Sequence, residues 1–235
     1  MLVVARAVLK IGKGRWLAAA LAIAAASQAQ AQDGNYSPDI ASFDGTRSMA
    51  IQPDPALAVN GDITVEFWVA PGWENDPGFD PVVASNISVE NASYIIAIMR
   101  DRDGVGVLSG GAEIVAPFDF SDGKLHHVAI VAADDGFSII VDGSVRGISE
   151  TALGAYDVDA FWIGSIDGSL GAFTGDIGQL RIWNAALDLE TLETFKFQPA
   201  FPQGDIVHPF IDALVAASVF PEAGLLLVEN DNTPQ

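Results

Sequence analysis

The sequence contains no cysteine. This absence excludes thiol redox chemistry and zinc sites built on thiolates. It also means that an exported form of the chain is held together by its core alone, without disulfide bonds. A single domain of roughly this length can bury a core that is large enough for this purpose.

Basic residues are scarce, with 11 Lys and Arg against 31 Asp and Glu, and the formal net charge is −20. A surface this acidic repels the phosphates of nucleic acids and anionic lipid headgroups, which excludes DNA, RNA and membrane surfaces as partners. The acidic surplus has two interpretations. The first is solubility, and the second is the binding of divalent cations.

No apolar run reaches the ~20 residues that a membrane-spanning helix needs. The longest one at the N-terminus, Trp16 to Ala26, lies between basic residues and the sequence Ala29-Gln30-Ala31. This order is typical of a cleaved secretory signal peptide, which we predict for residues 1–31. We therefore expect a secreted, periplasmic or cell-surface protein whose mature chain does not insert into a membrane. The basic residues of this leader are Arg6, Lys10, Lys13 and Arg15.

Short segments of alternating polarity are abundant. In "ITVEFWV", Ile63, Val65 and Phe67 share one face of a strand, whereas the residues between them share the other. Asp-Gly pairs, which tolerate the left-handed backbone of tight turns, separate several such segments. This pattern predicts an all-β protein, a sandwich or a barrel. Similar segments occupy 93–99, 104–110, 137–143, 160–164 and 177–183.

The C-terminal part contains one expected helix and a tail. Asp188 is a plausible N-cap for a helix that presents Leu189, Leu192 and Phe195 on one face. Within the tail, residues 197–235, we expect a short helix over 208–220 and a last strand over 224–229. We predict that this tail packs on the sandwich or extends it.

Two adjacent histidines, His126 and His127, precede two aspartates in "LHHVAIVAADDGFSIIVDG". Neighbouring side chains of a strand point to opposite faces, so the two imidazoles do not chelate one metal ion. The aspartates, Asp134 and Asp135, fall in the turn at the far end of the strand, roughly 25 Å away. We therefore interpret the histidines as structural residues of a β-hairpin.

The same stretch, extended to residue 147, resembles the central hairpin of laminin G-like domains in the concanavalin A-like lectin/glucanase superfamily. Those domains usually read Trp-His-His-Val-Ala, followed by a strand that ends in Val-Asp-Gly. Residues 42–73 and 173–195 are similar to the opening and closing blocks of the same family. The resemblance implies an antiparallel jelly-roll sandwich of two sheets with one short helix near the C-terminal end, spanning residues 32–196. It also implies that ligands meet the rim loops or the concave face.

The sequence departs from this family at three positions. Leu125 replaces the usual tryptophan, and Gly178 and Gln179 stand where the closing strand often carries acidic residues. Glucanases of the superfamily carry their carboxylates as Glu-x-Asp-x-x-Glu on one strand, and this string is absent. Glu66 lies on a suitable strand, but it has no carboxylate two residues away, so we predict a protein without enzymatic activity. The fold itself hosts lectins, adhesion modules and glycosidases.

Two loops carry the candidate site residues. In "APGWENDPGFDP", an aromatic ring could stack on a sugar while its polar neighbours hold the hydroxyl groups. The ligand-binding candidates are Trp73, Asn75, Asp76 and Asp80. In "RDRDG", Asp101 and Asp103 are the candidate ligands of a metal ion, for which calcium is the expected cofactor. The alternatives are that Trp73 caps the edge of the core and that the second loop is a solvated turn.

The sequence thus predicts an exported, non-catalytic module that binds a glycan or an extracellular or cell-surface protein, with calcium as an assistant. One alternative is an assembly protein that docks its apolar tail on a partner chain. A less favoured alternative is a glycoside hydrolase of the same fold.

Overall fold

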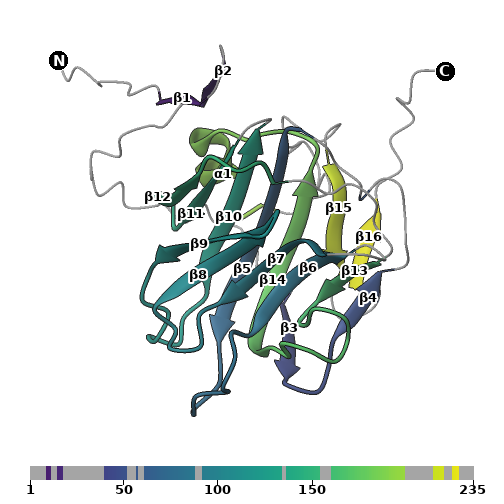
Figure 1. Ribbon diagram of the computed structural model, residues 1–235. Helices are drawn as coiled ribbons and strands as arrows, with labels where there is room; N and C mark the ends of the chain where they lie inside the picture. Colours follow the sequence, from purple (N-terminus) through teal and green to yellow (C-terminus); the bar gives the residue numbers. More distant parts are fainter. Residues whose placement is uncertain are drawn as a thin grey trace.

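The computed structural model describes residues 9–11, 15–17, 40–51, 57, 61–87, 92–133, 136–153, 160–198, 214–219 and 224–227. Two large antiparallel sheets dominate this part of the chain (Figure 1). Two further strands, β1 (Leu9–Ile11) and β2 (Arg15–Leu17), pair only with each other. They fall within the predicted leader, whose remaining residues lie outside the described ranges.

The first sheet has eight strands in the order β12-β11-β10-β5-β14-β15-β16, and β3 also pairs with β14. The bounds of its strands are β3 Ile40–Asp44, β5 Ile63–Pro71, β10 His126–Ala133, β11 Gly136–Val141, β12 Ser144–Ser149, β14 Thr174–Trp183, β15 Leu214–Val219 and β16 Gly224–Leu227. The predicted histidine-containing hairpin is confirmed as β10 and β11, in which Val128 faces Val141. Its tip, Asp134 and Asp135, lies outside the described residues.

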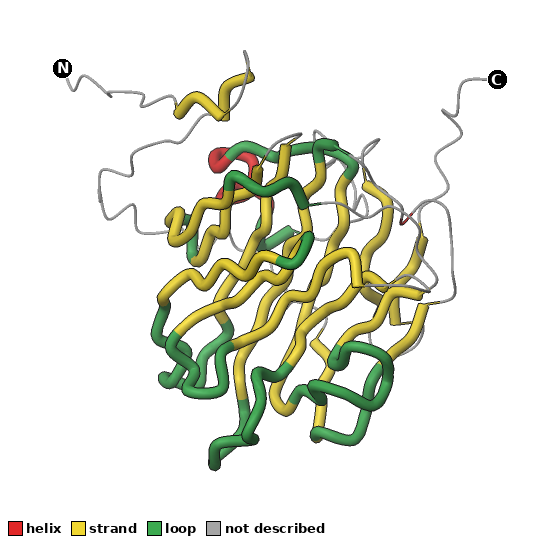
Figure 2. The backbone as a smooth tube through the Cα atoms, viewed as in Figure 1, coloured by secondary structure: helices red, strands yellow, loops and turns green. Residues whose placement is uncertain are grey.

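The second sheet has six strands in the order β4-β13-β6-β7-β8-β9. Their bounds are β4 Met49–Ile51, β6 Val82–Ile87, β7 Ala92–Ile98, β8 Gly104–Ser109, β9 Ala112–Pro117 and β13 Ala160–Ile163. The edge strand β9 lies against β12, and β4 lies against β16, so the two sheets meet along both sides (Figure 2). The predicted antiparallel sandwich is therefore confirmed.

The alternation in β5 separates two apolar layers. Val65 and Phe67 point into the main core between the sheets. Thr64, Glu66 and Trp68 point the other way, yet they are buried as well. Helix α1 (Leu189–Phe195) and the loop before it cover this outer face. A smaller core lies there, made of Ala129, Val131, Ile140, Trp183, Leu187 and Leu192.

The predicted N-cap of this helix is confirmed. The Asp188 carboxylate accepts a hydrogen bond from the Thr191 backbone N–H at 2.7 Å. Leu187 N–H in turn donates to the Thr64 hydroxyl at 3.0 Å, which ties the loop before the helix to β5. The described residues include no helix long and apolar enough to span a membrane.

The tail adds strands, and the expectation of a helix over 208–220 is wrong for residues 214–219. These residues form β15, whose Ala216 pairs with Ile182 of β14. The backbone groups along that edge of β14 need hydrogen-bond partners, and an extended segment supplies them where a helix does not. The expected last strand is confirmed as β16, which pairs with β15.

Candidate functional site

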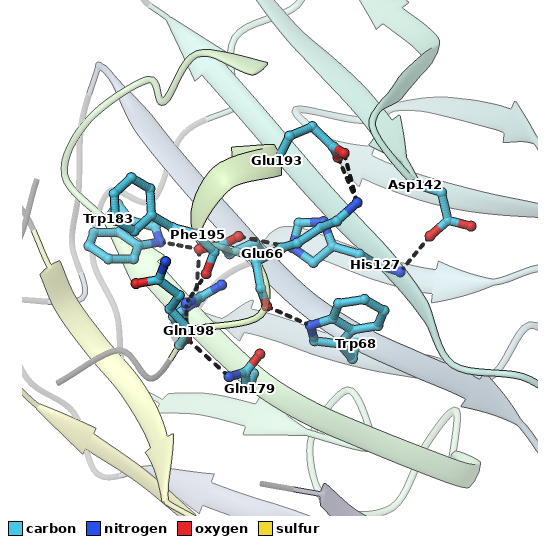
Figure 3. Close-up of polar contacts among 11 residues, drawn as sticks. Glu66, Trp68, His127, Asp142, Gln179, Trp183, Glu193, Phe195 and Gln198 are labelled. Atoms are coloured by element: carbon cyan, nitrogen blue, oxygen red, sulfur yellow. Dashed lines mark hydrogen bonds and ion pairs between the residues drawn. The ribbon is translucent and has the colours of Figure 1, made fainter. Parts of the chain in front are cut away.

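A buried cluster of polar side chains surrounds Glu66 on the helix-covered face of the eight-stranded sheet (Figure 3). Its side chain is only 2% exposed. Arg181 forms an ion pair with it, with Nε 2.8 Å from Oε1, and Trp183 Nε1 donates to the same oxygen at 2.8 Å. His127 Nε2 lies 2.9 Å from Oε2. Glu66 of β5 and the three side chains that contact it, from β10 and β14, therefore form one cluster.

The backbone of β14 places Arg181 opposite Glu66. Gly178 pairs with Trp68, and the next paired residue of β14 is Arg181, so the strand contains a bulge between them. Gln179, within the bulge, has φ of +43°, a left-handed conformation that is uncommon for a residue with a side chain. The bulge re-aims the strand and brings the guanidinium onto the outer face.

The cluster keeps Glu66 ionised. Burial raises the pKa of Glu66, but the charge of Arg181 and the contact with His127 outweigh this effect and lower it to about 2. A carboxylate with this pKa does not serve as a proton donor near neutral pH. Since the side chain is also inaccessible, the geometry indicates a structural role and not an acid catalyst.

The same cluster fastens the segment that follows α1. Arg181 Nη1 donates to the Gln198 carbonyl at 3.1 Å, and Gln179 Nε2 donates to it at 3.2 Å. Trp68 Nε1 donates to the Lys196 carbonyl at 3.1 Å. These contacts lie over the buried Glu66 cluster, whose Glu66, His127 and Arg181 side chains are at most 2% exposed, so the cluster itself offers no surface to a ligand.

The loop between β5 and β6, residues 72–81, carries the predicted ligand-binding residues. Trp73 is 8% exposed and belongs to the main core. Its Nε1 donates to the Arg100 carbonyl at 2.8 Å, and its ring meets Phe173 edge to face at 5.8 Å. The expectation that Trp73 offers a stacking face is therefore corrected, because the core occupies that face. Trp73 instead packs at the edge of the core, as the alternative interpretation expected.

A different aromatic residue of the same loop faces solvent. Phe79 is 43% exposed. Asn75 and Asp76 are exposed beside it in sequence, and Asp76 Oδ1 accepts a hydrogen bond from the Gly78 backbone N–H at 2.7 Å. Sequence analysis missed Phe79. The signal was present, since Phe79 sits between turn residues and outside any alternating strand pattern.

The predicted metal residues lie in the turn between β7 and β8, residues 99–103. Asp101 and Asp103 are both exposed. The Arg100 backbone N–H donates to Asp80 Oδ1 at 2.8 Å, so this turn and the loop 72–81 are joined. Within the described residues, no three His, Cys, Asp or Glu side chains are grouped so as to hold a metal ion.

A third segment, residues 118–125, completes this end of the sandwich. Its Phe118 and Phe120 backbone N–H groups donate to the carbonyls of Asp103 and Arg102, at 2.9 and 2.8 Å. We call the segments 72–81, 99–103 and 118–125 together the acidic rim. They belong to the loops at the lower end of the molecule in Figure 2. The structure thus brings the predicted ligand loop and the predicted metal turn into one surface.

Comparisons with known proteins agree with this architecture. Residues 43–192 match the Laminin G 3 family of the concanavalin A-like lectin/glucanases superfamily. A search among curated proteins found no match. Among solved structures, the fold is similar to a native heptameric pentraxin from Limulus polyphemus, with 18% identity and a TM-score of 0.55. That alignment covers 83% of this chain and 96% of the pentraxin.

Two bacterial domains are also similar in fold. Domain 4 of AbnA, a GH43 extracellular arabinanase from Geobacillus stearothermophilus, was solved with arabinotriose. It shows 13% identity and a TM-score of 0.52, over 68% of this chain and 76% of the domain. The CBM40 domain of the Ruminococcus gnavus IT-sialidase shows 11% identity and a TM-score of 0.51, over 66% of this chain and 95% of that domain.

Proposed function

The chain belongs to the concanavalin A-like lectin/glucanase superfamily, and from this premise we propose that it is an exported, non-catalytic module that binds a glycan at the acidic rim. The observation that carries the proposal is the exposed ring of Phe79 beside exposed polar side chains. An aromatic face binds the apolar face of a sugar, while amides and carboxylates accept hydrogen bonds from its hydroxyl groups. We assign the hydrogen bonds with the sugar hydroxyl groups to Asn75, Asp76 and Asp80.

Similar domains support this proposal. The arabinanase domain holds arabinotriose, which shows that a jelly-roll of this shape can bind an oligosaccharide. For this chain, a non-catalytic role is favoured by the burial of Glu66 beneath α1 and by its low pKa. Export is favoured by the leader pattern of residues 1–31.

The charge of the rim favours an uncharged glycan. Its exposed carboxylates are Glu74, Asp76, Asp101, Asp103, Asp119 and Asp122. The exposed basic residues of the same surface are Arg100 and Lys124. A sulfated or uronic acid-rich chain would meet net repulsion here, whereas a neutral chain would not.

The first prediction concerns Phe79→Ala. We expect it to weaken binding of a neutral oligosaccharide about tenfold, because truncating an aromatic contact residue typically costs more than about 1 kcal/mol. The measurement is a glycan array followed by titration calorimetry on the full chain. Ile148→Ala is the matched control, since Ile148 is also exposed but lies in β12, outside the three rim segments.

Both variants should keep the melting temperature of the wild type, because surface substitutions change stability by about 0.5 kcal/mol or less. An array without any bound glycan would overturn the proposed function. If Phe79→Ala binds the oligosaccharide as tightly as the wild type, the binding site lies outside the rim.

The second prediction concerns calcium, which we propose as an assistant at Asp101 and Asp103. Calcium takes six to eight oxygen ligands, so two carboxylates need backbone carbonyls or glycan hydroxyls to complete the shell. At a hundredfold excess over Kd, binding to the folded state alone adds about 2.7 kcal/mol. For a domain of this size we expect the melting temperature to rise by roughly 5–10 °C.

Thermal melting in EDTA, calcium and magnesium measures this effect, with the Asp101→Ala/Asp103→Ala double variant as the control. Magnesium should stabilise less, because it demands a tighter octahedral shell. Equal melting temperatures in all three buffers would contradict the calcium proposal. A calcium effect that survives in the double variant would place the ion elsewhere.

The assembly alternative is less well supported. It needs the apolar tail to be free for a partner chain, yet β15 and β16 of this tail pair within their own sheet, where β15 lies against β14.

A further inference from the structure

The imidazole of His126 bridges two carboxylates from separate segments. Its Nδ1 lies 2.7 Å from Asp142 Oδ2, in the turn after β11, and its Nε2 lies 3.0 Å from Asp122 Oδ1, in the rim segment before β10. A neutral imidazole has one donor nitrogen and one acceptor nitrogen, whereas the protonated ring donates from both. Two carboxylates on the two nitrogens are therefore satisfied together only by the protonated ring.

The surroundings of His126 hold it in place. Phe118 and Phe120 meet the ring edge-on, with centroids 4.8 and 5.6 Å away. Arg146 of β12 lies over the Phe118 ring at 5.4 Å, and Lys124 Nζ is 3.1 Å from Asp122 Oδ2. The charged groups that pack around the imidazole are thus two carboxylates and two more distant cations.

The electrostatics agree with this geometry. Burial lowers the pKa of His126, but hydrogen bonds with Asp142 and Asp122 outweigh burial and raise it. The contact with His126, followed by the Lys124 backbone N–H, holds the pKa of Asp122 well below its usual range. Since the pKa of His126 is raised in the folded state, the contribution of the bridge is complete below the unfolded-state pKa. It is lost as the pH rises through the folded-state pKa.

The bridge reaches the candidate binding residues through backbone contacts. His126 anchors Asp122, which belongs to the same segment as Phe118 and Phe120. The backbone N–H groups of Phe118 and Phe120 donate hydrogen bonds to the carbonyls of Asp103 and Arg102. The turn 99–103 in turn places Arg100, whose N–H binds Asp80 Oδ1.

We propose that His126 is a proton-operated positioning residue for the acidic rim. Protonated, it locks the segment 118–125 to the turn after β11 and so orders the turn 99–103 and Asp80. Deprotonated, one of its two ring nitrogens becomes an acceptor that faces a carboxylate acceptor, and the segment 118–125 is released. A role of this ordering in glycan binding rests on the proposed function. The proton-dependent ordering of the segment does not depend on that function.

Amide hydrogen exchange of the full chain tests this inference without any ligand. Protection factors of the Phe118 and Phe120 amides are measured from pH 5 to pH 9, with the Ile130 amide in the middle of β10 as the internal control. In the wild type we expect the protection of the two rim amides to fall about tenfold as His126 deprotonates, because deprotonation removes a hydrogen bond between charged groups. The Ile130 amide should keep its protection.

Two variants separate this role from a merely structural one. His126→Gln should make the protection of the rim amides independent of pH. Asp142→Asn keeps an oxygen for the His127 N–H but removes the charge, so the fall in protection should shift to lower pH. Asp142→Asn carries the test if His126→Gln does not fold.

Protection of the rim amides that stays constant from pH 5 to pH 9 in the wild type would overturn the inference. The same pH-dependent fall in His126→Gln would overturn it as well. A fall that is present in the wild type and absent in His126→Gln supports it, even where no glycan binds. In that case only the proposed function fails.

Discussion

Arg181→Met is expected to lower the free energy of unfolding by about 3–5 kcal/mol, the cost of leaving one partner of a buried ion pair behind. Arg181 and Glu66 have side chains only 1% and 2% exposed, so water does not replace the missing guanidinium. Methionine preserves much of the side-chain volume, which keeps a cavity effect small. The variant also lacks the donor to the Gln198 carbonyl.

The double variant Glu66→Gln/Arg181→Met separates the charge effect from the packing effect. With the carboxylate gone, no unpaired charge remains, and replacing both partners of a buried pair is often neutral. We expect the double variant to recover most of the stability in urea unfolding. A coupling energy near zero between the two positions would contradict the ion-pair interpretation.

The pH dependence of stability provides a second test of the same cluster. The folded-state pKa of Glu66 is lowered to about 2, so its stabilising contribution is present above its unfolded-state pKa and is lost as the pH falls toward about 2. In Arg181→Met, burial acts on Glu66 without its strongest opposing charge. The folded-state pKa of Glu66 then lies closer to its unfolded-state value, so acidification removes less stability from the variant than from the wild type. We therefore expect the stability difference between the two proteins to shrink as the pH falls toward about 2.

The fold was predictable because its signals are local. Alternation in "ITVEFWV" marks β5, an Asp-Gly turn closes β11 at Asp142, and Asp188 caps α1 by a contact only three residues away. The tail was less predictable, since a short apolar segment such as 214–219 fits a strand or a helix equally well by periodicity. Its pairing with β14 is a tertiary contact.

The candidate site was predictable only as a loop. The sequence places Trp73 and Phe79 between the same two strands, and either could face solvent. Which one does depends on Phe173 and Arg100, which are distant in sequence and pack against Trp73. The histidines show the same limit, because the carboxylates that contact them in the described part of the chain come from β5, from the segment before β10 and from the turn after β11. These partners are Glu66, Asp122 and Asp142.

Trp73→Ala should be the most damaging substitution in the rim, with a loss of about 3–5 kcal/mol in the free energy of unfolding. The indole fills the core between Phe173 and its neighbours, so truncation leaves a cavity and removes the donor to the Arg100 carbonyl.

Trp73→Phe is the matched control for this prediction. It keeps an aromatic ring in the core but lacks the indole N–H, so it should lose less, about 1–2 kcal/mol for the unsatisfied carbonyl and the smaller ring. Chemical unfolding of the full chain, with Phe79→Ala alongside, measures all three. The burial of Trp73 and the exposure of Phe79 require opposite results. Trp73→Ala should lower the free energy of unfolding, whereas Phe79→Ala should leave it unchanged and weaken binding. Equal stability losses at the two positions would mean that the loop does not divide its aromatics between core and solvent in this way.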